Sequence, residues 1–99
     1  MSVPILRSPM EVRMIIADRV KRLRLQKNLS REGLAKKSGV PASTIKLFET
    51  TGKISFVSLV ALSFALGRHG DFEELFKIDD MPKSLFDKEP KLRKRGQKK

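Results

Sequence analysis

Hydroxyl and cationic side chains lie close together in residues 31–50, where they could bind a nucleic acid. Ser43 and Thr44 carry hydroxyls that can bond to phosphate oxygens or to the edges of bases. Lys46 can reach a base or a phosphate, and Arg31 can make two parallel bonds to a guanine or bind a phosphate. These side chains can act together only if the chain holds them on one rigid surface.

The spacing of small and apolar residues predicts that surface: two helices joined by a tight turn. Ser30 is a candidate N-cap for the first helix. Ala35 allows two helices to approach closely, and Gly39 suits the left-handed backbone that ends the first helix. The second helix covers residues 41–50, with Ile45 on its buried face. This is a helix-turn-helix, a unit that holds one helix so that it can enter the major groove of DNA.

The length of the chain predicts one small helical domain with two tails. We expect a flexible N-terminal arm over residues 1–9, the domain over residues 10–79 and an extended basic C-terminal tail over residues 80–99. The tail has too few apolar residues to fold alone. The first helix of the domain covers residues 10–27 and carries one apolar stripe, formed by Ile16, Val20 and Leu23.

Two more helices are predicted after the helix-turn-helix. Ser55 caps a helix over residues 56–66, which is apolar almost all round and is expected to be the central core helix. Gly67 ends it. Asp71 caps a fifth helix, with Glu74 three residues later in capping-box spacing. The expected fold class is therefore all-α.

The formal net charge of +11 indicates a polyanionic partner. The basic residues are spread over several segments instead of lying on one amphipathic helix, which argues against a membrane surface. The chain has no cysteine, and we expect no metal and no cofactor. No secretory signal and no membrane-spanning apolar run is present, which predicts a cytoplasmic, nucleoid-associated protein.

Residues 16–76 resemble the Cro/phage-repressor (Xre) family of DNA-binding domains. The matching pieces are IADRVKRLRLQKNLS, REGLAKKSGV, PASTIKLFETTG, SFVSLVALSFALG and DFEELF. The resemblance implies a compact five-helix, lambda-repressor-like domain and a sequence-specific transcriptional regulator. One departure is the pair Thr50 and Thr51 before Gly52, where the family usually has a single residue.

The last two of these pieces are most similar to HipB-type antitoxin repressors. That narrower resemblance implies an autorepressor in a toxin-antitoxin system, with a HipA-type serine/threonine kinase toxin as a partner. The basic tail would then either bind the DNA backbone or be ordered by the partner protein.

The resemblance also implies which residues contact double-stranded DNA. Bases are read mainly from the positions of Ala42, Ser43 and Leu47, with Arg31 assisting. Ala42 and Leu47 offer only apolar contacts, as with a thymine methyl, where the family often has Gln or Arg. The candidate DNA-binding residues are Arg31, Ala42, Ser43, Thr44, Lys46, Leu47, Thr50, Thr51 and Lys53.

Arg24 and Glu49 lie where the family carries a partly buried ion pair between the first helix and the end of the recognition helix. Pairing with Arg24 would prevent Glu49 from repelling the DNA phosphates. Removing one partner would leave the other charge stranded and would destabilise the fold.

A single domain of this kind reads only a few base pairs, so such proteins dimerise onto two half-sites about one helical turn apart. We therefore expect a homodimer on an inverted-repeat operator. The candidate dimer-interface residues are Phe72, Phe76, Ile78, Met81, Leu85 and Phe86.

Three rival functions remain at this point. An enzyme is disfavoured, because the sequence has no Gly-rich phosphate loop, no HExxH and no Ser-His-Asp set. A protein-interaction module that binds and neutralises a toxin kinase, with DNA binding secondary, is kept open by the weak base-reading character of Ala42 and Leu47. An RNA-binding protein is disfavoured because Tyr and Trp are absent.

Overall fold

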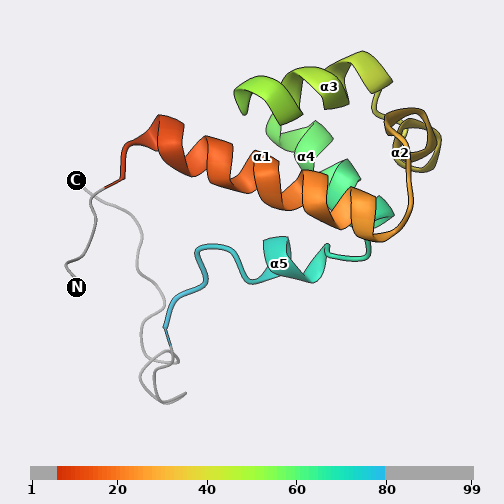
Figure 1. Cartoon of the computed structure of the whole chain (residues 1–99). Coiled ribbons are helices and arrows are strands. Elements are labelled where there is room, and N and C mark those ends of the chain that lie inside the picture. Colours follow the sequence, from red (N-terminus) through yellow and green to blue (C-terminus); the bar gives the residue numbers. More distant parts are fainter. Residues whose placement is uncertain (1–6, 80–99) are drawn as a thin grey trace.

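The computed structural model describes residues 7–79, which form five helices and no strand (Figure 1). The helices are α1 (Pro9–Gln26), α2 (Arg31–Ser38), α3 (Ala42–Thr51), α4 (Phe56–Ala65) and α5 (Gly70–Glu73). The predicted all-α, five-helix fold is confirmed. The predictions for residues 1–6 and 80–99, including those for Met81, Leu85 and Phe86, lie outside the described residues.

The first helix begins at Pro9, one residue earlier than predicted, because a capping box precedes it. The N–H of Glu11 donates to the Ser8 hydroxyl at 3.1 Å, and the N–H of Ser8 donates to the Glu11 carboxylate at 2.9 Å. Pro9 suits this place because the first N–H of a helix has no partner within the helix. Ser8 and Glu11 are three residues apart in the sequence, which is the spacing of a capping box.

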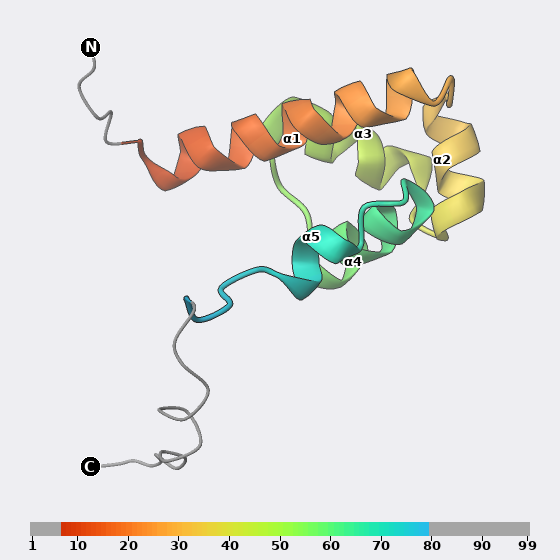
Figure 2. The same cartoon turned by 90° about the horizontal axis from the view of Figure 1, so that it is seen from below.

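The core is formed by one inward face from each of the first four helices. Figure 1 shows α3 on one side of α1 and α5 on the other, and Figure 2 shows α5 lying against α4. The fully buried apolar residues are Ala17, Leu34, Val40, Ile45, Phe48, Leu62 and Leu66. The predicted apolar stripe on α1, formed by Ile16, Val20 and Leu23, is partly buried and packs against this cluster. The core therefore holds α3 from its inner side only.

Glycines with a left-handed backbone conformation end α2 and α3. Gly39 follows α2 with a φ of 82°, and Gly52 follows α3 with a φ of 78°. Each donates its N–H to a carbonyl of the preceding turn, at 2.8 Å to Ala35 and 2.7 Å to Phe48. Ser30 caps the start of α2 by accepting a bond from the N–H of Gly33 at 2.9 Å. The short connections fix the direction in which α3 leaves α2.

The prediction that the fourth helix is the central core helix was wrong in part. Ser55 caps α4 as expected, but Phe56, Val57 and Phe64 are 61%, 78% and 61% exposed. The reason is that α2 covers one face of α4, while α5 is a single turn and covers little more.

No single helix in residues 7–79 has both the length and the apolar character to cross a membrane. Within this range, only α3 and α4 taken together reach that length and composition, and a bend of 105° separates them.

The predicted cap of the fifth helix was also wrong. The helix begins at Gly70, and its N-cap residue is His69, which makes no side-chain capping bond. The carboxylate of Asp71 instead forms an ion pair with Arg68 at 2.9 Å. A left-handed φ of 59° at Phe76 prevents the chain from continuing as a helix through that residue.

Substitution of the two helix-ending glycines should separate backbone strain from crowding. Gly39→Ala should lower the free energy of unfolding by about 1 kcal/mol, because a left-handed φ is unfavourable for alanine and the space around it is open. Gly52→Ala should lower it by more, since its Cβ would lie 3.0 Å from Cγ and 3.2 Å from the backbone carbonyl carbon of Arg13 in α1. Urea unfolding measures both. Equal losses would contradict the close packing of α3 against α1.

Candidate nucleic-acid interface

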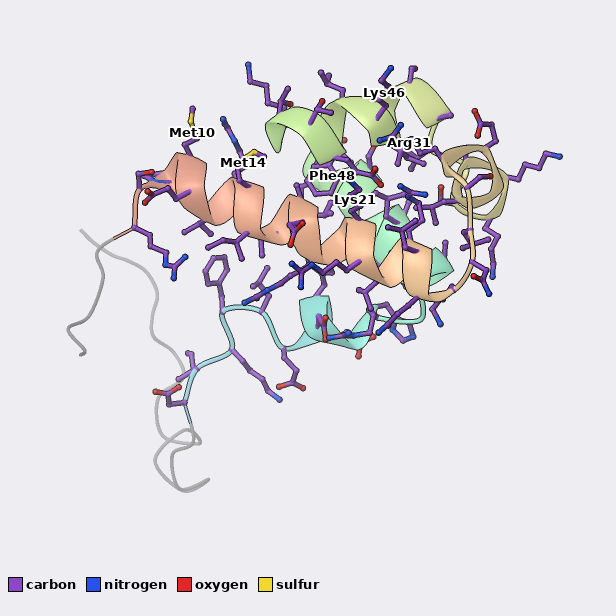
Figure 3. All side chains as sticks on the ribbon, in the orientation of Figure 1. Met10, Met14, Lys21, Arg31, Lys46 and Phe48 are labelled. Atoms are coloured by element: carbon purple, nitrogen blue, oxygen red, sulfur yellow. The ribbon has the colours of Figure 1, made fainter. Side chains whose placement is uncertain are left out.

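One face of α3 is exposed and carries polar, cationic and apolar side chains. Ser43, Lys46, Leu47 and Thr50 are exposed, whereas Ile45, Phe48 and Glu49 are buried. The spacing of the exposed set, three and four residues apart, places its members along one stripe of the helix. We call Ser43, Lys46, Leu47 and Thr50 the outer stripe of α3. Figure 3 shows Lys46 pointing away from the body of the molecule.

The remaining candidate contacts on and after α3 flank this stripe. Ala42 and Thr44 are half-buried in the first turn, and Lys53 is exposed in the loop after the helix. The hydroxyl of Thr51 donates to the carbonyl of Leu47 at 2.7 Å and accepts the N–H of Lys53 at 3.1 Å. Thr51 thus closes the loop between α3 and α4, which leaves its hydroxyl little capacity for a phosphate.

The buried carboxylate of Glu49 lies where three helices meet. Its side chain is 1% exposed. Arg24 of α1 binds both oxygens, through Nε at 2.7 Å and Nη2 at 3.0 Å. The Nη1 of Arg24 also donates to the carbonyl of Leu29, between α1 and α2, at 2.9 Å. Arg31 of α2 donates from Nε to the Glu49 Oε1 at 3.0 Å. One carboxylate therefore ties α3 to α1 and to α2.

The charge of this carboxylate is stabilised by its partners. Burial raises the pKa of Glu49 because it disfavours the charged form, but the hydrogen bonds and positive charges of Arg24 and Arg31 outweigh burial. The pKa of Glu49 therefore lies below its ordinary value of 4.5. The group is ionised at neutral pH, and the three side chains together carry one net positive charge.

The bond from Arg31 to Glu49 was missed at the sequence level. The sequence predicts Arg31 as a DNA contact and gives no internal partner for it, yet its Nε is bonded inside the protein and its side chain is 33% exposed. The two residues are 18 positions apart. Local periodicity carries no information about such a contact, because it depends on how α2 packs against α3.

Two methionines near the start of α1 were also missed. Met10 is 59% exposed and Met14 is 37% exposed, and Figure 3 shows both on the side of α1 where α3 lies. Their spacing of four residues places them on one face of the helix and could have identified them. They add an apolar margin beside the candidate interface.

The described candidates for the dimer interface lie on α5 or in the segment after it, and Figure 1 shows α5 on the other side of α1 from α3. Phe72 is half-buried and meets Phe56 of α4 edge-on, with ring centroids 5.6 Å apart. Phe76 is 93% exposed and Ile78 is 73% exposed. Residues 7–79 contain no cluster of three or more His, Asp or Glu side chains that could hold a metal ion.

Comparison with models of protein families identifies the family of this chain. A family model described as Helix-turn-helix matches residues 20–72, just over half of the chain. The matched range contains every described candidate DNA contact, together with Arg24 and Glu49. No curated protein matches the chain.

Removal of the buried carboxylate should destabilise the protein in a pH-dependent way. Glu49→Ala strands two guanidiniums, one of them buried, and should lower the free energy of unfolding at pH 7 by about 3 kcal/mol or more. Because the pKa of Glu49 is lowered in the folded state, its contribution is complete above pH 4.5 and is lost as the pH falls through the folded value. The difference from wild type should shrink accordingly, as measured by urea unfolding across that range.

Glu32→Ala is the matched control, since Glu32 is an exposed glutamate on α2. It should change stability little at any pH. A loss at Glu49→Ala that stays constant from neutral to acid pH would contradict the ionised, paired state of this group.

Proposed function

This chain belongs to the Xre/Cro-type helix-turn-helix family of DNA-binding transcriptional regulators, and we propose that it binds an inverted-repeat operator as a homodimer and represses its own operon. The observation that carries the proposal is the outer stripe of α3, which is exposed along the helix that a helix-turn-helix inserts into the major groove.

The side chains on and beside the outer stripe support a particular kind of base reading. Ser43 and Thr44 can bond to base edges or phosphates, and Lys46 can reach a guanine or a phosphate. Leu47, which is 51% exposed, and Ala42 can contact thymine methyl groups. Sequence preference would then come from a few polar contacts together with apolar contacts. The paired hydrogen bonds that Asn or Gln side chains make to adenine would play no part.

The DNA backbone would be held by cations beside the stripe. Lys53, in the loop after α3, is exposed and lies at the end of the stripe that Thr50 occupies. The formal net charge of +11 supports an affinity that falls steeply with salt, because each cation that neutralises a phosphate releases a counterion.

The exposed apolar side chains of α4 and of the segment after α5 support self-association. Phe56 and Val57 at the start of α4 are largely exposed, as are Phe76 and Ile78. Monomeric proteins rarely leave such a group of large apolar side chains in water. We propose this surface, with Phe72 at its edge, as the dimer interface.

A second candidate function rests on the same apolar surface. A partner protein could cover it instead of a second copy, and the HipB-like resemblance favours a kinase toxin as that partner. In this alternative the chain neutralises the toxin by direct contact, and DNA binding is secondary. The oligomeric state of the isolated protein separates the two candidates.

Removal of one cation from the outer stripe should weaken DNA binding. On a duplex selected by the wild-type protein from a randomised library, Lys46→Ala should reduce affinity by about tenfold if it contacts a base. If it contacts a phosphate, the loss should be uniform across sequences, and the salt slope should fall by about one. Fluorescence anisotropy at several salt concentrations measures both quantities.

Lys77→Ala removes the same charge from the segment after α5, where Lys77 pairs with Glu74 at 3.2 Å, and should leave affinity close to wild type. Equal effects of the two substitutions would count against α3 as the reading helix. Equal binding of wild type to the selected duplex and to a scrambled one would reject sequence-specific regulation.

Loss of one exposed aromatic side chain should disrupt the dimer. Phe76→Ser should convert a dimer at micromolar concentration into a monomer, because it removes a large apolar group from the proposed interface. Leu47→Ser, which removes an exposed apolar residue from α3, should remain dimeric. Analytical ultracentrifugation distinguishes the states. A wild-type protein that stays monomeric with and without the selected duplex would favour the partner-protein alternative.

A further inference from the structure

We propose that Glu49 acts as a positioning residue for DNA binding: its carboxylate orients the guanidinium of Arg31 so that the outer edge of that group binds a pair of acceptor atoms on DNA. This inference rests on the proposed DNA-binding function. It gives the buried ion cluster a role beyond holding the helices together.

The geometry of Arg31 divides its guanidinium into an inner and an outer edge. Only Nε is bonded, to the Glu49 Oε1 at 3.0 Å. The terminal nitrogens Nη1 and Nη2 make no hydrogen bond to any of residues 7–79. The side chain of Arg31 is 33% exposed, while that of Glu49 is 1% exposed. A planar guanidinium bonded through Nε still presents two N–H groups side by side, which match phosphate oxygens or the O6 and N7 of guanine.

The carboxylate that holds Arg31 is itself fixed. Both of its oxygens are bonded to Arg24, and Arg24 is held in turn by the carbonyl of Leu29. Since Glu49 cannot rotate without breaking these bonds, the position of Nε on Arg31 is set by the core and not by the solvent. A long side chain held in this way loses less conformational freedom when it binds.

The net charge of the cluster favours DNA. One carboxylate is bonded to two guanidiniums, so the three side chains carry one net positive charge, and Arg31 is the more exposed of the two cations. Lys46 lies one turn before Glu49 on α3, and Figure 3 shows Arg31 close to α3 where α2 meets it. Arg31 therefore extends the outer stripe of α3 with a cation from a different helix.

A double-mutant cycle tests the proposal. Arg31→Ala, Glu49→Gln and the double variant are compared with wild type on the duplex selected by the wild-type protein, at a temperature where circular dichroism shows all four folded. Arg31→Ala should reduce affinity by about tenfold. Glu49→Gln should reduce affinity in the wild-type background and have little further effect once Arg31 is absent. The proposal is overturned if the loss of affinity in the double variant equals the product of the two single losses, because a purely structural role of Glu49 does not depend on Arg31.

A second variant keeps the proposal testable if Glu49→Gln does not fold. Arg31→Lys retains the charge, but a single ammonium cannot bond to Glu49 and also present two parallel donors outward. It should lose nearly as much DNA affinity as Arg31→Ala. Affinity equal to wild type for Arg31→Lys would overturn the proposal.

Repeating the library selection with Arg31→Ala shows whether Arg31 contacts a base or a phosphate. Loss of a guanine preference at one position identifies a base contact. A uniform loss with a salt slope smaller by about one identifies a phosphate contact. Either result supports the positioning role when the cycle is non-additive.

The two proposals fail in different ways. Equal binding of wild type to the selected and scrambled duplexes rejects sequence-specific regulation, whatever the cycle gives. Discrimination by wild type together with an additive cycle rejects only the positioning role of Glu49.

Discussion

The ionised carboxylate of Glu49 is the constraint on which the arrangement of the first three helices depends. Removing a carboxylate from water costs several kcal/mol unless it is paired and hydrogen-bonded. Glu49 follows Phe48 on α3, and both side chains are buried where α3 meets α1 and α2. Arg24 and Arg31 must therefore reach it from α1 and α2. Their bonds fix where the three helices meet, and they determine which face of α3 remains in water.

The small size of the domain explains its two exposed surfaces. The core is one layer of seven buried apolar residues. It covers the inner sides of α3 and α4 but cannot enclose both helices. On α3 the outward residues are mainly short, polar or cationic, which suits a nucleic acid. On α4 they include Phe56, Val57 and Phe64, which suit a protein surface. The same limit on burial thus leaves two exposed faces of different chemical character.

Local signals in the sequence predicted most of the helix ends, and long-range packing caused the errors. Ser30, Gly39 and Ser55 act within a few residues of themselves, and each was identified correctly. The exposure of Phe64 could not be predicted, because the apolar pattern of residues 56–66 does not tell how many neighbours cover the helix. Asp71 has the right type and spacing for a cap, but Arg68 competes for its carboxylate. A one-dimensional pattern does not rank these two interactions.

The candidate site shows the same division. The sequence by itself determined that α3 has a buried face through Ile45 and Phe48 and an outer face through Ser43 and Lys46, because helical periodicity fixes both once the helix is known. Only the tertiary structure decided the environment of Arg31. Its Nε meets a carboxylate 18 residues away, and that meeting depends on the angle between α2 and α3, which the turn at Gly39 and the packed core set together.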